Sequence, residues 1–210
     1  MKSTVAKLDT KDSILDATDR LLARYGYRKM TMDDLAQEVG IGKGTIYLHF
    51  PSKQELVLSH IDRVISRVID GLKVIAASGD SPADKIRAML VLRVMLRFDS
   101  VQHFTESLSE VLRDLRSSVL EKRQGHFMSE GAIFAKVVRA GEAVGIFRRQ
   151  NCSATAHALL EATNSLLPFN LSTRELGKRE EVEARVERIA DLLLDGLISG
   201  SVRTTRPPKI

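Results

Sequence analysis

The sequence has little that could support a covalent or metal-based framework. One cysteine, Cys152, is present among 210 residues, so neither an internal disulfide nor a cysteine-based metal site is possible. His103, His126 and His157 are scattered without the spacing typical of metal ligands, and we expect no metal and no cofactor. There is no Trp and only three Tyr, which argues against an aromatic cage for a cationic ligand.

Long apolar runs are also missing. No run approaches the roughly 20 residues needed to cross a membrane, and the N-terminal sequence MKSTVAKLDT lacks the apolar segment of a signal peptide. Hydrophobic residues make up 43% of the chain and the mean hydropathy is −0.09, which indicates a soluble protein with a buried core. Together these features predict a cytoplasmic protein without a membrane partner.

Catalytic signatures do not stand out either. The sequence has no evident Ser-His-Asp arrangement, carboxylate pair or phosphate-binding glycine loop, so we do not expect an enzyme. The net charge of +5 is compatible with a nucleic-acid partner but does not establish one, because the N-terminal part is nearly balanced in charge. The placement of particular side chains therefore has to carry the functional argument.

Helical periodicity extends almost throughout the chain, and no strand pattern or internal repeat interrupts it. A first helix is predicted from Asp9 or Thr10 to Tyr25, with Gly26 in the left-handed conformation after it. Capping boxes predict the starts of two further helices, over 32–39 and from Ser52 to about Ala76, and these boxes pair Thr31 with Asp34 and Ser52 with Glu55. Later helices are predicted over 82–98, 104–118, 120–144, 153–170 and 179–200.

The stretch IGKGTIYLHFPSKQEL, residues 41–56, contains a second short helix over about 43–49. The two short helices are joined by Gly-Ile-Gly, which is typical of a helix-turn-helix in length and in turn chemistry. Ile46 is expected to face the core, and Gly44 has no side chain to hold back an approaching partner. The outward-facing residues are then Lys43, Thr45, Tyr47 and His49. Such a face is typical of a helix that reads the major groove, although it also fits an ordinary helical surface.

Residues 14–57, ILDATDRLLARYGYRKMTMDDLAQEVGIGKGTIYLHFPSKQELV, resemble the DNA-binding domain of the tetracycline-repressor (TetR) family of bacterial transcriptional regulators. The likeness rests on the Tyr-Gly end of the first helix, the Thr-capped second helix, the Lys-Gly-Thr-x-Tyr-x-His-Phe motif and the Ser-Lys-x-Glu-Leu opening of the fourth helix. Gly42 departs from the pattern, because a capping Ser or Thr is common at that position.

The resemblance implies an all-α fold of about nine helices, with an N-terminal three-helix helix-turn-helix DNA-binding domain and a C-terminal helical ligand-binding and dimerisation domain. The expected organisation is a flexible N-terminus (1–9), the DNA-binding domain (10–70, with the helix-turn-helix at about 32–51), the effector-binding and dimerisation domain (71–201) and a flexible tail (202–210).

The resemblance also implies roles at DNA. Thr31, Lys43 and Lys53 are expected at phosphates, and Tyr47 at the backbone or a sugar. Side chains near base edges supply any sequence readout, and Phe50 is expected in the core. The implied DNA-binding set is Thr31, Lys43, Gly44, Thr45, Tyr47, His49 and Lys53.

Arg93 and Arg97 lie one turn apart on an otherwise apolar helix. They are candidates for holding an anionic head group of an effector; the alternatives are a solvated edge, or ion pairs with Glu106 or Glu110. The Leu, Met and Phe content favours a lipophilic ligand. The candidate ligand-binding residues are Met89, Arg93, Leu96, Arg97, Phe98, His103, Phe104, Glu161 and Asn164.

The last predicted helix carries an apolar stripe, and the helix before it is rich in small residues that allow close helix approach. Together they favour a four-helix dimer interface, with an intrachain core as the alternative. The candidate interface residues are Leu159, Leu166, Val186, Ile189, Leu193 and Leu197. Because one recognition helix contacts few bases, DNA selectivity also favours a homodimer.

We therefore predict a bacterial, cytoplasmic, nucleoid-associated regulator. It would be a homodimeric repressor that a small lipophilic effector releases from an inverted-repeat, double-stranded DNA operator. A helical adaptor for protein partners is the alternative, and it would lack specific, salt-sensitive DNA binding.

Overall fold

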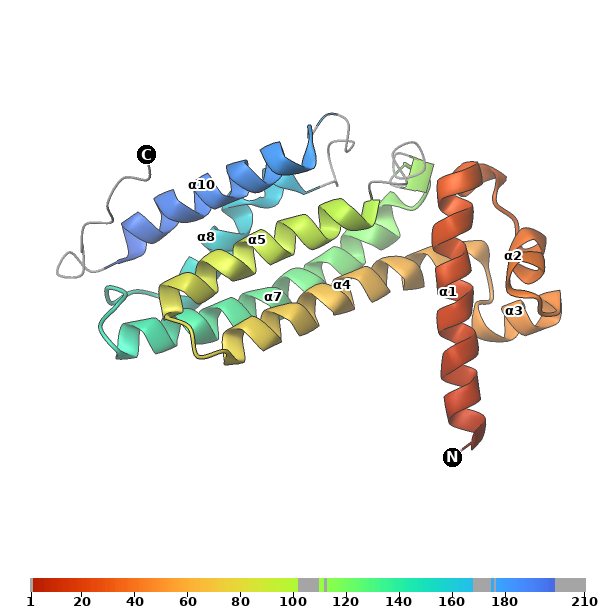
Figure 1. Ribbon diagram of the computed structural model, residues 1–210, viewed down its shortest axis with the longest axis horizontal. Coiled ribbons are helices and arrows are strands. Elements are labelled where there is room, and N and C mark those ends of the chain that lie inside the picture. The colour runs from red at the N-terminus through yellow and green to blue at the C-terminus, as the bar shows by residue number, and fades with distance from the viewer. Residues whose placement is uncertain (1, 102–109, 112, 168–174, 176, 199–210) are drawn as a thin grey trace.

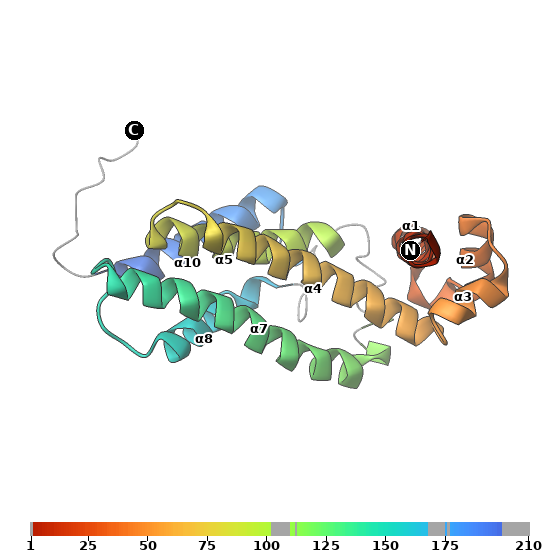
Figure 2. The same ribbon diagram turned by 90° about the horizontal axis from the view of Figure 1, so that it is seen from below.

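The computed structural model describes residues 2–101, 110–111, 113–167, 175 and 177–198. Within these ranges all regular secondary structure is helical, and an isolated bridge pairs Phe147 with Ile198. The all-α fold class is therefore confirmed. Figure 1 and Figure 2 show α1, α2 and α3 grouped at one end of an elongated molecule, with the other helices forming a bundle and α4 reaching from one group to the other.

The N-terminal group consists of α1 (Lys2–Lys29), α2 (Met32–Val39) and α3 (Lys43–His49). The predicted bounds of α2 and α3 are confirmed, but α1 begins earlier than expected and takes in most of the segment predicted as a flexible terminus. Gly26 interrupts α1 with φ 77° and ψ 169°. Its φ is positive, as predicted, but its ψ is extended, and helix resumes over the few residues before Met30.

Helix α4 (Lys53–Ala77) belongs to both hydrophobic cores. Its first half contributes Leu56 to the N-terminal core, and its second half contributes Val68 and Leu72 to the C-terminal core. The Oγ of Ser52 accepts a hydrogen bond from the amide of Glu55 at 3.1 Å, which is one of the two bonds of the predicted capping box and caps the start of the helix. A single helix therefore extends from one part of the molecule to the other.

The C-terminal bundle contains α5 (Pro82–Val101), α7 (Arg116–Ala143), α8 (Cys152–Ala162), the 3₁₀-helix η2 (Asn164–Leu166) and α10 (Arg179–Leu197). Helix α5 packs against both α4 and α10, and α7 packs against α8. The prediction of one helix over 153–170 was wrong, because α8 ends at Ala162 and a 3₁₀ turn follows. Of the helix predicted over 104–118, residues 104–109 and 112 lie outside the described residues, and residues 116–118 belong to α7.

The apolar stripe of α10 is buried by the chain's own helices. Val186 and Leu197 belong to the C-terminal core, as do Leu159 and Leu166 from α8 and η2. These four residues were expected at a dimer interface, and the intrachain alternative accounts for them instead. Ile189 and Leu193 pack at the edge of the same core and remain partly exposed. Among the described helices, none is both long and apolar enough to cross a membrane.

Candidate DNA-binding surface and effector site

The geometry of the helix-turn-helix follows from local hydrogen bonds. The Oγ1 of Thr31 accepts from the amide of Asp34 at 3.1 Å, and the carboxylate of Asp34 accepts from the amide of Thr31 at 2.9 Å. This is the predicted capping box. Hydrogen bonds from the hydroxyl and then the amide of Thr31 to the Asp34 carboxylate lower the pKa of that carboxyl. Gly40 adopts φ 75° and ψ 32° at the end of α2, where its amide donates to the carbonyl of Ala36 at 3.0 Å.

Thr31 is exposed, but its amide and hydroxyl are both bonded to the carboxylate of Asp34, with 2.7 Å from Oγ1 to Oδ2. A phosphate that approached Thr31 itself would therefore have to displace Asp34 or lie beside it.

Helix α3 presents a mixed polar and apolar face to solvent. Ile46 is fully buried and anchors the helix, Tyr47 is exposed, and a Cβ added at Gly44 would meet nothing within 4 Å. Thr45 and His49 are half-buried, and Phe50 is in the core, as predicted.

Leu48 is 81% exposed, and the sequence analysis did not include it among the DNA-facing residues. Helical spacing could have found it. Leu48 follows the buried Ile46 by two residues, which places it on the opposite side of the helix.

The two predicted phosphate-binding lysines differ in their surroundings. The Nζ of Lys43 lies 2.7 Å from the Oδ2 of Asp33 in an exposed ion pair, which water screens and which the lysine can exchange for a phosphate. The Nζ of Lys53 instead donates to the carbonyls of Tyr27 (2.8 Å), Met30 (3.1 Å) and Arg28 (3.3 Å). Lys53 therefore binds carbonyls in the last turn of α1 and at Met30 just after it, and is not presented to solvent as a free phosphate ligand. Burial lowers its pKa.

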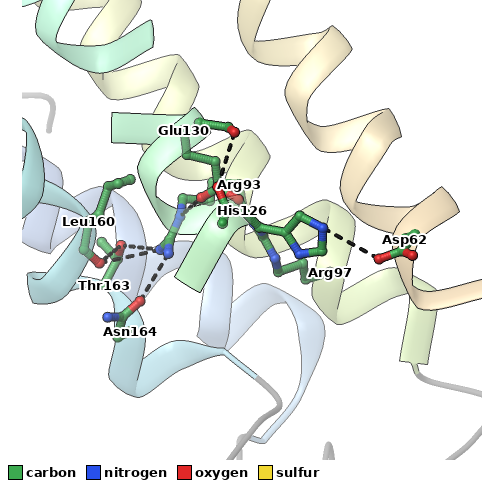
Figure 3. Close-up of polar contacts among 10 residues, drawn as sticks. Asp62, Arg93, Arg97, His126, Glu130, Leu160, Thr163 and Asn164 are labelled. Atoms are coloured by element: carbon green, nitrogen blue, oxygen red, sulfur yellow. Dashed lines mark hydrogen bonds and ion pairs between the residues drawn. The ribbon is translucent and has the colours of Figure 1, made fainter. Parts of the chain in front are cut away.

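The two arginines of α5 lie inside the bundle. Arg93 and Arg97 are 2% and 4% exposed, and both bind the buried Glu130 of α7, as Figure 3 shows. The Nε of Arg93 is 2.6 Å from the Oε2 of Glu130, and the Nη2 of Arg97 binds Oε1. The alternative that the two arginines form a solvated edge is thus excluded, and their ion-pair partner is Glu130. Of the two glutamates considered from the sequence, Glu110 accepts a bond from the amide of Arg28 at 3.1 Å, and Glu106 lies outside the described residues.

Arg93 also joins α5 to α8 and η2. Its Nη1 donates to the Oγ1 of Thr163 at 3.0 Å and to the carbonyl of Leu160 at 3.3 Å, and its Nη2 donates to the Oδ1 of Asn164 at 2.9 Å (Figure 3). Burial lowers the pKa of Arg93 to about 10, against the opposing effect of Glu130, so the guanidinium stays charged at neutral pH. Asn164, a predicted ligand residue, is here a partner of Arg93.

A small cavity lies beside this ion cluster, between α4, α5 and α7. Its volume is about 20 Å³, room for roughly one water molecule and far below the several hundred Å³ of a typical effector pocket. Its lining residues are Ile61, Ile65, Arg93, Arg97, Val119, Lys122, Arg123, His126, Phe127 and Glu130.

The other predicted ligand residues are spread over the bundle. Met89 and Phe98 are buried in the core, Leu96 packs at its edge, and Glu161 is exposed on α8. His103 and Phe104 lie outside the described residues. Among the described members of the predicted set, Arg93 and Arg97 alone line the small cavity.

A carboxylate on α4 bridges to α7 next to the cavity. The Oδ2 of Asp62 is 2.6 Å from the Nζ of Lys122. The Oδ1 of Asp62 is 3.4 Å from the Nε2 of His126, and Figure 3 shows this contact. We call this group, Asp62 with Lys122 and His126, the α4–α7 clasp. Burial lowers the pKa of His126, against the opposing effect of Asp62. In the described part of the chain, no group of three His, Cys, Asp or Glu side chains is placed to hold a metal ion.

Ion pairs also tie the N-terminal helices to the rest of the molecule. Arg63 of α4 binds Asp16 at 2.6 Å and Asp19 at 3.0 Å, both on α1, and Arg28 binds Asp114 at 3.4 Å. Val119 of α7 belongs to the N-terminal core cluster. The N-terminal group therefore contacts the bundle along both α4 and the start of α7.

The chain resembles known proteins in sequence and in fold. Residues 14–59 match the family model described as bacterial regulatory proteins, tetR family. An HTH-type transcriptional regulator of Haemophilus influenzae is 46% identical over 61 residues, which cover 29% of this chain and 33% of that protein. The chain thus spans only about a third of that relative's length.

Two longer matches extend beyond the N-terminal domain. The HTH-type transcriptional regulator TtgR of Pseudomonas putida is 26% identical over 168 residues, covering 73% of this chain and 77% of TtgR. The crystal structure of a transcriptional regulator from Cytophaga hutchinsonii superposes with a TM-score of 0.73 at 21% identity, covering 89% of this chain and 97% of that one. The match to the Cytophaga hutchinsonii structure shows similarity of fold alone. Over residues 14–59, the chain is therefore similar to the tetR family of bacterial regulatory proteins.

Proposed function

We propose that the protein is a sequence-specific DNA-binding transcriptional regulator, acting as a homodimeric repressor that a small lipophilic ligand releases from its operator. The observation that carries this proposal is the exposed face of α3. A short helix held by a capped helix-turn-helix presents a bare backbone at Gly44 beside the exposed Tyr47 and Leu48. That combination suits close approach to base edges in the major groove.

Dimerisation is supported by the surface that the bundle leaves uncovered. Leu192 of α10 is 68% exposed, and the neighbouring Ile189 and Leu193 are partly exposed. On α8, Ala154 and Ala158 are exposed and small enough to allow close helix approach. We assign the dimer interface to this surface, the α8–α10 outer face, in place of the buried stripe. The operator is then an inverted repeat whose half-sites face two recognition helices about 34 Å apart.

Ligand control is supported by the position of α4. A ligand releases a repressor only if it binds the DNA-incompetent form more tightly than the competent one. Helix α4 belongs to both cores, so a change in its contacts with α7 alters the position of α3. A coupling of about 1–3 kcal/mol lowers DNA affinity roughly 5- to 150-fold.

The first prediction tests DNA binding directly. Full-length protein should select a palindromic sequence from a random DNA pool, and the affinity should fall steeply with salt. Lys43→Ala should weaken binding to every sequence and reduce the salt dependence by about one phosphate contact per subunit. Tyr47→Ala should also weaken binding to every sequence.

Lys73→Ala is the matched control, because Lys73 is an exposed lysine of α4 that pairs with Asp70. It should bind DNA as the wild type does. Failure to select any sequence, or wild-type affinity in the folded Lys43 and Tyr47 variants, would favour the protein-adaptor alternative.

A further inference from the structure

The buried ion cluster of α5 and α7 is unbalanced in charge. Arg93 and Arg97 contribute two positive charges, and Glu130 contributes one negative charge between them. All three side chains are almost completely buried. Buried charges are costly unless they are compensated, so the excess positive charge favours the approach of a second anion.

Arg97 also has a donor that the described part of the chain leaves unused. Its Nη1 donates to the carbonyl of Arg93 at 3.0 Å and its Nη2 donates to Glu130, but its buried Nε has no hydrogen-bond partner among the described residues. Arg97 lines the small cavity between α4, α5 and α7. A buried donor without a partner destabilises the empty protein, and an acceptor in the cavity would relieve that cost.

The remaining walls of the cavity match an amphiphilic molecule. Ile61 and Ile65 of α4 and Phe127 of α7 supply an apolar side, while Arg123 adds another positive charge at the lining. Lys122 is paired with Asp62, so the excess positive charge at the lining comes from Arg93 and Arg97 sharing Glu130, and it favours a negatively charged occupant.

We propose that this cavity is the effector site and that its ligand is an organic anion with an apolar body, such as an aliphatic carboxylate. The ligand carboxylate accepts a hydrogen bond from the Nε of Arg97, and its chain lies against Ile61, Ile65 and Phe127. Glu130 keeps its bonds to both arginines. This inference rests on the proposed function, since it names the ligand class of the regulator.

Binding has to widen the cavity, because the present space of about 20 Å³ holds roughly one water molecule. The α4–α7 clasp resists that widening through the 2.6 Å pair between Asp62 and Lys122. A ligand that separates α4 from α7 breaks the clasp and moves α4, whose first half belongs to the N-terminal core. The anion site and the position of α3 are thereby linked.

The experiment uses the full-length protein with octanoate, dodecanoate and hexadecanoate, each compared with the primary alcohol of the same length, by titration calorimetry. At least one carboxylate should bind at least tenfold more tightly than its alcohol. Arg97→Met should reduce carboxylate binding at least tenfold. The Arg97→Met variant should still fold, because Arg93 still pairs with Glu130 and the buried cluster becomes neutral.

Arg87→Met is the matched control, because Arg87 lies on α5 but pairs with Asp191 of α10 outside the cavity; it should bind carboxylates as the wild type does. If Arg97→Met does not fold, Arg123→Gln at the cavity wall should weaken carboxylate binding several-fold. The proposal is overturned if no carboxylate binds, if the alcohols bind equally well, or if the folded Arg97→Met or Arg123→Gln variant keeps wild-type affinity.

Operator binding is measured separately on the same proteins without carboxylate. Wild type and Arg97→Met should both bind the selected DNA, so a failure confined to carboxylate binding overturns only the ligand assignment. Carboxylate binding by a protein that selects no DNA would instead overturn the proposed function.

Discussion

At the scale of single residues, Leu48 offers the clearest test of how α3 reads DNA. A large apolar side chain that is 81% exposed contributes little to folding, so Leu48→Ala should leave the free energy of unfolding within about 0.5 kcal/mol of wild type. If its methyl groups contact a thymine methyl, affinity for the selected operator should fall about tenfold, and the preference for thymine at one position should relax. Repeating the selection with the variant measures both effects.

Val74→Ala is the control for that prediction, because Val74 is an exposed apolar residue of α4 in the half that belongs to the C-terminal bundle. It should change neither affinity nor preference. An unchanged base preference in Leu48→Ala would show that this side chain does not read the operator.

Residue contacts were predictable where their chemistry is local. The pairing of Thr31 with Asp34 spans three positions, and its residue types alone indicate a helix start. The partner of Arg93 was not predictable in the same way, because Glu130 lies 37 positions away and either of two nearer glutamates fitted the spacing. Lys53 likewise reaches the carbonyl of Tyr27, 26 positions earlier, which no local pattern indicates.

At the scale of elements, His60 of α4 contacts α1. This buried histidine lies 3.0 Å from Asp19, and burial lowers its pKa below 6.5 despite the opposing effects of Asp19 and Asp16; Arg63 and Arg67 lower it further. Below pH 6.5 the unfolded chain therefore binds a proton that folded His60 resists. The free energy of unfolding should have its full value above pH 6.5. It should decrease as the pH falls from 6.5 through the lower pKa of folded His60, by at most about 1.4 kcal/mol per pH unit.

Urea unfolding at a series of pH values checks this. His60→Gln should flatten the decline just below pH 6.5, although His126, whose pKa is lowered in the same direction, should keep part of it. The same slope in wild type and in a folded His60→Gln variant would contradict the prediction.

Helix boundaries, like residue contacts, were predictable where their cause is local in sequence and were missed where a distant residue is involved. The bounds of α2 and α3 follow from a cap and a glycine turn that lie within the helix-turn-helix itself. The end of α8 was missed, because Arg93 from α5 bonds to the carbonyl of Leu160 and the hydroxyl of Thr163, where the helix gives way to η2. Apolar periodicity continues through that point and gives no sign of the distant guanidinium.

At the scale of the whole molecule, apolar residues that are buried within one chain stabilise the subunit, and apolar residues that stay exposed are available for a dimer interface. Val186 is fully buried in the monomer, whereas Leu192 lies on the α8–α10 outer face and is 68% exposed. Leu192→Glu should therefore leave the subunit folded, because a charge at that position stays in water. In the dimer the same charge would be buried without a partner, so assembly should fail.

Sedimentation and operator binding measure the two consequences together. Leu192→Glu should sediment as a folded monomer and lose high-affinity binding to the inverted repeat, because one recognition helix engages only one half-site. Val74→Glu places a charge on an exposed apolar position of α4 and should remain a dimer that binds DNA. Val186→Glu should instead unfold the subunit, since it buries a charge in the core. A Leu192→Glu protein that stays dimeric would move the interface away from the outer face of α10, and a monomeric wild type would remove the dimer from the proposed mechanism.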